Sequence, residues 1–282
     1  MRIIDNIEDL ITFRGEITPD KTVGFVPTMG ALHKGHLSLL DEASSKSDII
    51  IASIYVNPTQ FAPGEDLEEY PRTLPQDIAQ LEAIGCDALF VPTNRIMYPD
   101  GFQTFVYNNE ISKILCGRTR ATHFEGVLTS VLKLFNLVRP EIAVFGKKDF
   151  QQVKVIEKMC RDLHLTVEVL SAPIFRESDG LAMSSRNLRL TKNDRELAPR
   201  IYRGLKLAND VYKQGERNIK SIKEAFHEAV LNTPLSLEYL EIRRASDLSE
   251  AVSGEESPWV MLTAAKLGDV RLIDNIELGY KH

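Results

Sequence analysis

The sequence is poor in cysteine, lacks a long apolar run and has no excess of positive charge, and each shortage excludes a class of protein. The three cysteines (Cys86, Cys116 and Cys160) are odd in number and widely spaced, so neither a disulfide framework nor a metal-binding spacing is indicated. No stretch approaches the ~20 apolar residues of a membrane span. The first residues also lack the basic-then-apolar pattern of a signal peptide. We therefore expect a reduced, cytoplasmic protein with no membrane partner.

The charge balance argues against a general nucleic-acid binder. The formal net charge is −6, from 34 basic and 40 acidic residues, whereas a nucleic-acid-binding surface is basic. Anionic substrates remain possible, because a local group of Lys, Arg and helix N-termini can outweigh the global sign. With 282 residues, 43% of them hydrophobic, the chain can form one large core or two smaller ones.

Apolar, β-prone runs alternate with helical patterns through the first part of the chain. Strands are expected at 23–27, 49–56, 88–91, 141–145 and 167–170, and helices at 76–84, at 127–138 and along Phe150, Val153, Ile156 and Cys160. Repeated β-then-α units predict an α/β fold with a Rossmann-like, doubly wound parallel sheet. Ligands of such sheets bind beyond the carboxyl ends of the strands.

The pattern changes after residues 176–180. A long amphipathic helix is expected along Leu197, Ile201, Leu205, Ala208 and Tyr212, and another over 222–231, followed by strands at 237–242, 259–264 and 270–273. This order predicts a smaller α+β C-terminal domain. We expect residues 1–176 to form the nucleotide- and substrate-binding domain and residues 177–282 to form a lid.

The segment 29–36, called the histidine turn below, is the most informative part of the sequence. It follows the strand that stops at Pro27, and Gly30 lies in its turn. His33 and His36 flank Lys34-Gly35 just before a helical pattern begins. A helix start offers free backbone N–H groups and a positive dipole end, so a phosphate can bind there. The two imidazoles can add hydrogen bonds or charge.

Two further loops follow expected strands. Asn57 and Gln60 lie in the loop 57–61, where their amides could bind a small polar substrate or simply form a turn. Lys147 and Lys148 lie at an expected helix start, where the macrodipole favours acidic residues instead. A bound polyphosphate could supply the missing negative charge, or the two lysines could simply be solvated. Gln152 follows Lys148 by about one helical turn.

Three weaker candidates complete the set. In the segment 183–187, called the serine loop below, the side chains of Ser184, Ser185 and Arg186 could hold phosphate oxygens. Arg120 lies in a basic loop that could bind a carboxylate or belong to the surface. Asp77 suits a helix N-cap or first-turn acid, with a magnesium ligand as the alternative.

In this order, the motifs 27–36, 57–61, 145–152 and 179–187 resemble the pantoate–β-alanine ligase family, and the likeness extends over nearly the whole chain. Two positions depart from the family's pattern. Lys147 stands where many members carry Glu, and Gln76 precedes Asp77 where some members have a second acid.

The resemblance implies a two-step reaction in which pantoate attacks ATP to give pantoyl adenylate and pyrophosphate, and β-alanine then displaces AMP. It implies catalytic roles for His36 above all, His33, Lys148, Ser184, Ser185 and Arg186, and pantoate binding by Gln60 and Gln152 with help from Asn57 and Arg120. Mg2+ would accompany ATP, with Asp77 as its candidate ligand, and the protein would be a homodimer. The residues expected around ATP are Met29, Gly30, Ala31, Leu32, His33, Lys34, Gly35, His36, Gly146, Lys147, Lys148, Asp149, Phe175, Met183, Ser184, Ser185 and Arg186.

The residue types suit this chemistry, because attack of one anion on another needs aligned donors and cations rather than a protein nucleophile. An adenylate is easily hydrolysed, which favours a closable cleft. The alternatives are another His-x-Gly-His adenylyltransferase, a relative of class I aminoacyl-tRNA synthetases, and a nucleotide sensor without catalysis. Another adenylyltransferase would leave the segments 57–61 and 148–152 unexplained. A relative of the aminoacyl-tRNA synthetases conflicts with the acidic net charge. A sensor without catalysis conflicts with the presence of both histidines and Lys148.

Overall fold

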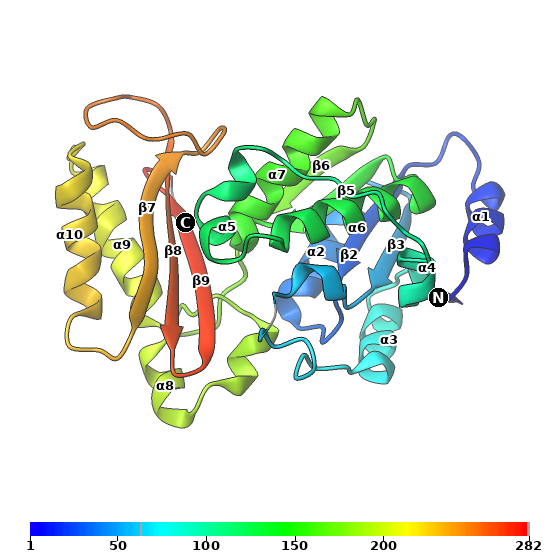
Figure 1. The fold of residues 1–282 in the computed structure, drawn as a ribbon, viewed down its shortest axis with the longest axis horizontal. Helices are drawn as coiled ribbons and strands as arrows, with labels where there is room; N and C mark the ends of the chain where they lie inside the picture. Colours follow the sequence, from blue (N-terminus) through cyan, green and yellow to red (C-terminus); the bar gives the residue numbers. More distant parts are fainter. Residues whose placement is uncertain (63, 281–282) are drawn as a thin grey trace. The chain divides into compact units, whose positions relative to one another are not determined.

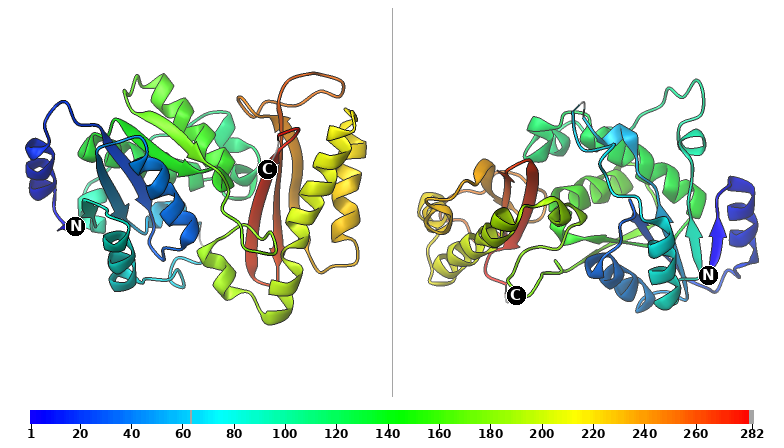
Figure 2. Two further views of the ribbon diagram at one scale, coloured as in Figure 1. Left: turned by 180° about the vertical axis from the view of Figure 1, so that it is seen from behind. Right: turned by 90° about the horizontal axis from the view of Figure 1, so that it is seen from below.

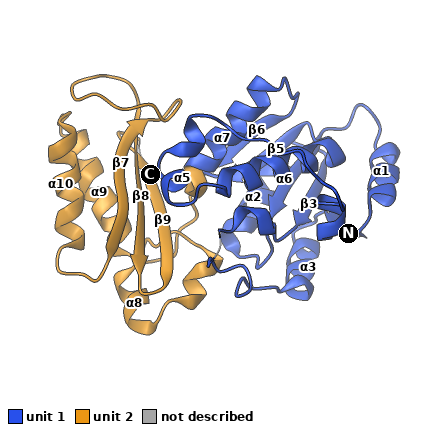
Figure 3. Cartoon of the chain, in the orientation of Figure 1, with its two compact units in different colours: residues 1–147, 151–173 blue, residues 148–150, 174–282 orange. Residues whose placement is uncertain are grey.

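The computed structural model describes residues 1–62 and 64–280, which form two compact units (Figure 3). Unit 1 contains residues 1–147 and 151–173, and unit 2 contains residues 148–150 and the chain from residue 174 onward. Residues 148–150 and 174–176 therefore group with the C-terminal part, whereas the sequence interpretation placed them in the N-terminal domain. The lid role assigned to the C-terminal part stays a prediction.

Unit 1 is built on a six-stranded parallel sheet, which confirms the predicted α/β, Rossmann-like class (Figure 1). Its strand order is β1-β4-β3-β2-β5-β6. The strands are β1 (Arg2–Ile4), β2 (Val23–Thr28), β3 (Ile49–Ile54), β4 (Ala88–Phe90), β5 (Ile142–Gly146) and β6 (Glu168–Ala172).

Helices pack on both faces of this sheet. They are α1 (Ile7–Glu16), α2 (Lys34–Ser44), α3 (Leu74–Ala83), α4 (Asn94–Met97), α5 (Cys116–Thr119), α6 (His123–Val138) and α7 (Phe150–Asp162), with 3-10 turns η1 (Pro58–Gln60), η2 (Ile111–Lys113) and η3 (Lys147–Asp149). Neighbouring residues of β2 show the two faces, since successive strand side chains point to opposite sides. Val26 joins a buried cluster with Leu39 of α2, whereas the Phe25 ring lies 6.4 Å from that of Phe135 of α6.

The strand order determines which loops become neighbours. From β2 the chain proceeds through β3 and β4 to one side, and from β5 it proceeds to β6 on the other side. The direction of winding therefore reverses between β2 and β5, and ligands of open parallel sheets bind at such a switch point. The carboxyl ends of β3, β2 and β5 lie side by side, so the loop 57–61, the histidine turn and Gly146-Lys147 begin at one edge of the sheet.

Unit 2 is an antiparallel sheet of β7 (Ser236–Arg244), β8 (Trp259–Leu267) and β9 (Val270–Glu277), packed against helices (Figure 2). Its helices are η4 (Ser185–Arg189), α8 (Lys192–Leu197), α9 (Arg200–Lys213) and α10 (Ile219–Val230). Trp259 is fully buried, with its ring 5.5 Å from that of Tyr212. This arrangement confirms the α+β class expected for the C-terminal part.

One predicted helix is wrong at its start. The apolar spacing placed Leu197 on the same helix as Ile201, but α8 ends at Leu197 and α9 begins at Arg200. Pro199 is the N-cap residue of α9, and a proline is tolerated at the start of a helix because its missing N–H has no helical partner there.

Candidate active site

The histidine turn is held by a buried carboxylate from α3. Asp77 accepts hydrogen bonds from the backbone N–H of Ala31 at Oδ2 (3.0 Å) and of Leu32 at Oδ1 (2.8 Å), and its side chain is almost fully buried. The turn needs such support because Gly30 (φ 80°) and Ala31 (φ 49°) adopt left-handed backbone conformations. Asp77 lies in the first turn of α3, but the N-cap residue is Thr73. Its carboxylate therefore stabilises the histidine turn and does not cap its own helix.

The two imidazoles of the turn are stacked. Their ring centroids lie 4.0 Å apart with an interplanar angle of 27°. The backbone N–H of His33, the N-cap residue of α2, donates to Nδ1 of His36 at 3.3 Å. Because Nδ1 of His36 is an acceptor, the neutral ring carries its proton on Nε2. His36 therefore offers Nε2 as its donor, and the first N–H groups of α2, at the same helix start, belong to Lys34 and Gly35.

The loop after β3 is held in shape by the hydrogen bonds of Asn57. Asn57 is 1% exposed, accepts from Thr59 Oγ1 (2.9 Å) and donates to the carbonyl of Gly126 (3.0 Å) and to Oε1 of Gln60 (3.3 Å). The Gln60 amide in turn donates to Sδ of Met29 at 2.8 Å, which joins this loop to the histidine turn. Asn57 thus shapes the loop, and Gln60 is partly exposed at its end. Contact of Asn57 with a substrate stays a prediction.

Two residues behind this loop were missed by the sequence interpretation. Gly126 of α6 lets the loop approach closely, because a Cβ at that position would lie 2.5 Å from the carbonyl of Thr59. Tyr98 places its hydroxyl 2.9 Å from Thr59 Oγ1. A glycine inside a strongly apolar helical pattern was the available signal for Gly126. No local pattern distinguishes Tyr98, which is partly exposed, from the other tyrosines.

The guanidinium of Arg120 is hydrogen-bonded to other residues of this chain. Its guanidinium binds Glu65 with two hydrogen bonds of 2.6 and 2.7 Å and donates to the carbonyl of Gln60 at 3.2 Å. His123 Nδ1 lies 2.8 Å from the same carbonyl. Burial raises the pKa of Glu65, but the hydrogen bonds and charge of Arg120 outweigh burial and hold that pKa below its usual value. Arg120 therefore fixes the backbone of Gln60, and its contact with a carboxylate substrate stays a prediction.

The two lysines after β5 fall into different units. Gly146 and Lys147 belong to unit 1, while Lys148 and Asp149 belong to unit 2. All four residues are partly exposed, as is Gln152. Lysine side chains here would offer charge to an anion without full desolvation.

Of the adjacent residues Gln151 and Gln152, Gln151 has a structural role. It is buried, accepts from the backbone N–H of Cys116 (3.0 Å) and donates to the carbonyls of Ile111 and Ile114 (2.7 Å each). This leaves the neighbouring Gln152, which is partly exposed, as the glutamine that can meet a ligand.

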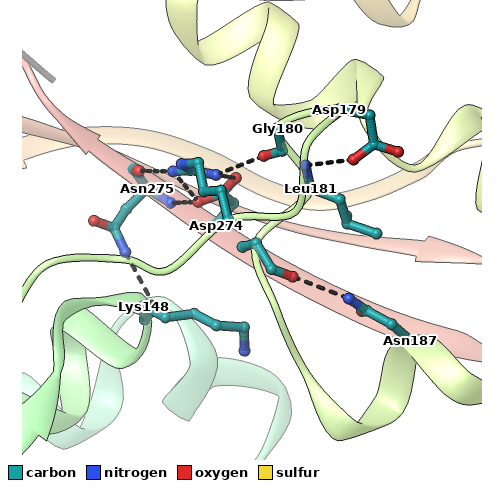
Figure 4. Close-up of polar contacts among 9 residues, drawn as sticks. Lys148, Asp179, Gly180, Leu181, Asn187, Asp274 and Asn275 are labelled. Atoms are coloured by element: carbon teal, nitrogen blue, oxygen red, sulfur yellow. Dashed lines mark hydrogen bonds and ion pairs between the residues drawn. The ribbon is translucent and has the colours of Figure 1, made fainter. Parts of the chain in front are cut away.

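The serine loop follows a short hairpin in unit 2 (Figure 4). Arg176 and Ala182 form an antiparallel bridge, Gly180 (φ 93°) makes the turn, and the backbone N–H of Met183 donates to the carbonyl of Phe175 at 2.9 Å. Ser184 is the N-cap of η4 and accepts from the N–H of Arg186 at 3.3 Å. Ser185 is buried, and Met183, Ser184 and Arg186 are partly exposed.

Side chains of α8 and η4 also bind this hairpin. Arg195 of α8 donates to Asp179 at 2.5 Å and to Glu177 at 2.6 Å, and these side chains are between 28% and 40% exposed. Asn187 adds hydrogen bonds to Glu177 (3.0 Å) and to the carbonyl of Ala182 (3.1 Å). These particular contacts of the hairpin are made by side chains that are partly open to solvent.

The described residues do not form a metal-binding cluster. Within 1–62 and 64–280 there is no group of three or more His, Cys, Asp or Glu that could hold a metal ion. Both oxygens of Asp77 already accept hydrogen bonds from the histidine turn and from Thr73 Oγ1. The donor set around Asp77 thus does not fit a protein-held Mg2+. In the same part of the chain, no helix combines the length and apolar character needed to cross a membrane.

Known proteins resemble this chain along almost its entire length. The family model described as pantoate-beta-alanine ligase matches residues 2–277. The pantothenate synthetases of Carboxydothermus hydrogenoformans and Thermotoga neapolitana are 46% and 47% identical over 281 residues, 99% of this chain and 99% and 100% of theirs.

Solved structures agree with these matches. The pantothenate synthetase of Thermus thermophilus superposes with a TM-score of 0.93 at 41% identity, covering 98% of this chain and 99% of that one. The pantoate-beta-alanine ligase of Francisella tularensis, whose structure is a complex with beta-gamma ATP and beta-alanine, gives 0.80 at 36% identity, with 98% and 97% covered.

Proposed function

The chain belongs to the pantoate–β-alanine ligase family, and on this basis we propose how its site carries out the ATP-dependent condensation of pantoate with β-alanine. A carboxylate oxygen of pantoate attacks the α-phosphorus of ATP, the bond to the bridging oxygen breaks, and pyrophosphate leaves. The amine of β-alanine then attacks the acyl carbon of pantoyl adenylate, loses a proton and releases AMP. The products are pantothenate, AMP and pyrophosphate.

The stacked histidines at the start of α2 carry this proposal. They lie at the switch point of the sheet, next to the first N–H groups of a helix, where phosphate binding is favoured. With Nδ1 of His36 accepting from the backbone, Nε2 donates to the phosphate oxygens on which negative charge develops. We assign the main catalytic role to His36 and a supporting contact to His33.

Pantoate is assigned to the glutamines. Gln60 is held by Met29 and Asn57, and Gln152 is the partly exposed member of its pair. Both amides can bind hydroxyl and carboxylate groups. Asn57 and Arg120 support pantoate binding through Gln60, since Asn57 binds its side chain and Arg120 its carbonyl.

The remaining assignments concern ATP. Lys148, Ser184, Ser185 and Arg186 stabilise the phosphate charge during transfer. The residues assigned to ATP binding, besides the catalytic residues, are Met29, Gly30, Ala31, Leu32, Lys34, Gly35, Gly146, Lys147, Asp149, Phe175 and Met183. Mg2+ would accompany ATP, where it would help to neutralise the phosphate charge. The enzyme acts in the cytoplasm as a homodimer, without nucleic acid or membrane partners.

Pantoate-dependent exchange of labelled pyrophosphate into ATP tests this function. With pantoate present and β-alanine absent, the enzyme should catalyse exchange, because adenylate formation is reversible before the amine arrives. Adding β-alanine should then convert pantoate to pantothenate with release of one AMP each time. Exchange without pantoate, or exchange that requires an amino acid instead, would contradict the proposal.

The alternative adenylyltransferases are not favoured. The family match extends over residues 2–277 and includes the loops 57–61 and 148–152, which those proteins leave unexplained. The exchange assay also distinguishes them, since an aminoacyl-tRNA synthetase relative would require an amino acid for exchange.

A further inference from the structure

Two buried polar residues in β9 contact both of the unit 2 segments assigned to ATP. Asp274 and Asn275 are only 5% and 4% exposed. Asp274 lies on the same face of β9 as Leu272 and Ile276, which belong to the hydrophobic core of unit 2, and Asn275 lies on the opposite face. A buried acid and amide cost desolvation energy unless they are hydrogen-bonded. Their partners therefore indicate what they do.

Asp274 binds the hairpin that precedes the serine loop (Figure 4). Its two oxygens accept from Nη1 and Nη2 of Arg176 at 2.7 and 2.9 Å, in the two-pronged geometry that restrains a guanidinium most strongly. Nη1 of Arg176 also donates to the carbonyl of Gly180 at the hairpin turn (3.1 Å), and the guanidinium lies 3.6 Å above the ring of Tyr202. Asp274 thus determines where the hairpin lies on β9.

Asn275 binds the backbone of Lys148. Its Nδ2 donates to the Lys148 carbonyl at 3.0 Å, and its own backbone N–H donates to Oδ1 of Asp274 at 2.8 Å. Figure 4 shows the Lys148 side chain extending away from this hydrogen bond. Two adjacent residues of one strand therefore hold Lys148 and the hairpin at fixed positions relative to each other.

We propose that Asp274 and Asn275 are positioning residues for adenylate formation, which keep Lys148 in register with Ser184, Ser185 and Arg186. This inference rests on the proposed function, which assigns those four residues to the phosphates of ATP. Neither positioning residue needs to touch a substrate. Their effect is on alignment, and a misplacement of about 1 Å at a reacting centre can reduce a rate by roughly a hundredfold.

Substitutions at both positions test this role in the complete enzyme, with single-turnover adenylate formation as the readout. Asp274→Asn removes the charge that restrains Arg176, and Asn275→Ala removes the donor to Lys148. Each should lower kcat roughly tenfold to hundredfold. The KM for pantoate should change by less than about twofold, because pantoate is assigned to Gln60 and Gln152. Asp274→Glu, which retains a carboxylate for Arg176, should recover part of the lost kcat.

Glu238→Gln is the matched control. Glu238 of β7 binds Arg271, which lies in the same strand as Asp274, at 2.9 Å, and these side chains are 15% and 19% exposed. Neither residue is among those assigned to ATP or pantoate. The loss of Glu238 removes the same charge from a similar ion pair and should leave kcat within about twofold of the wild type. Thermal unfolding of each variant shows whether it is folded at the assay temperature. Should Asp274→Asn fail to fold, Arg176→Lys keeps the charge but loses the two-pronged contact.

The outcomes separate the two proposals. Wild-type enzyme without pantoate-dependent exchange would overturn the proposed function and this inference together. An active wild type would leave the function standing. The positioning role is then overturned if folded Asp274→Asn and Asn275→Ala match Glu238→Gln in kcat, or if kcat and the pantoate KM deteriorate equally in all three.

Discussion

The histidine turn of unit 1 and the serine loop of unit 2 are held in place by different kinds of contact. The turn is fixed through its backbone by one carboxylate, Asp77, which is 1% exposed. The loop follows a hairpin whose restraints are side-chain ion pairs, and those of Arg195 are about one-third exposed. Buried polar contacts are stronger and costlier to break than exposed ones, which exchange with water.

This difference indicates which contacts break more easily. A turn pinned through its own N–H groups keeps its shape whether or not a ligand is bound. The hairpin combines the partly solvated ion pairs of Arg195, which break at a lower cost in free energy, with the buried pair of Arg176 and Asp274. We therefore expect the contacts of Arg195 with the hairpin to break more easily than the contacts of Asp77 with the histidine turn.

The largest expected effect is on catalysis and involves both units. His36→Ala in unit 1 and Lys148→Ala in unit 2 should each slow single-turnover adenylate formation by at least roughly a hundredfold, the scale of single charge-stabilising groups. His164→Ala and Lys192→Ala remove the same side chains at exposed positions and should leave the rate unchanged. A near-wild-type rate in His36→Ala or Lys148→Ala would contradict the catalytic role assigned to that residue.

The next effect concerns stability and compares the two kinds of restraint directly. Asp77→Asn should lower the free energy of unfolding by about 2–4 kcal/mol, because buried N–H groups lose a charged acceptor. Arg195→Gln should cost no more than about 1 kcal/mol, since its ion pairs are partly exposed. Urea titrations of both variants measure the two values. Equal losses would show that the hairpin is as firmly held as the turn.

A smaller effect separates backbone strain from crowding inside the histidine turn. Gly30 and Gly85 both have φ of 80°, but a Cβ at Gly30 would lie 3.1 Å from Asp77 Oδ2 and 3.1 Å from Ile54 Cγ2, whereas nothing lies within 4 Å of a Cβ at Gly85. Gly85→Ala should cost about 1–2 kcal/mol for the left-handed backbone alone. Gly30→Ala should cost about 1 kcal/mol more, from crowding against Asp77 and Ile54. Equal losses for both variants in urea unfolding would show that the packing around Gly30 accommodates a methyl group.

The smallest effect is a pH dependence found in both units. The pKa of Glu65 is lowered because the hydrogen bonds and charge of Arg120 outweigh burial, and that of Asp179 because Arg195 does the same. A carboxyl whose pKa is lower in the folded state adds stability above its unfolded pKa and loses it as the pH falls toward the folded value. The stability lost in Glu65→Gln or Asp179→Asn should therefore be larger at about pH 7 than at about pH 3. A loss that does not depend on pH would contradict these pairings.

Local patterns were sufficient for most of the fold. The β-branched run at 49–56 predicted β3, and the apolar spacing along Phe150, Val153, Ile156 and Cys160 predicted α7, because a buried strand and an amphipathic helix leave distinct periodicities in a sequence. The break between α8 and α9 was missed because the apolar spacing continues across it. Short elements such as α4 and α5 also carry too few residues for a periodic signal.

By itself, the sequence determined the parallel sheet, the α+β part that follows it, and the candidate residues at strand ends and helix starts. These features depend on neighbours within a few positions along the chain. Only the tertiary structure decided how the candidates are held. Asp77 acts 46 positions away on Ala31, Gly126 makes room for a loop 67 positions earlier, and Asp274 binds Arg176 across 98 positions. Such partners are selected by the packing of the folded chain, and no local pattern records them.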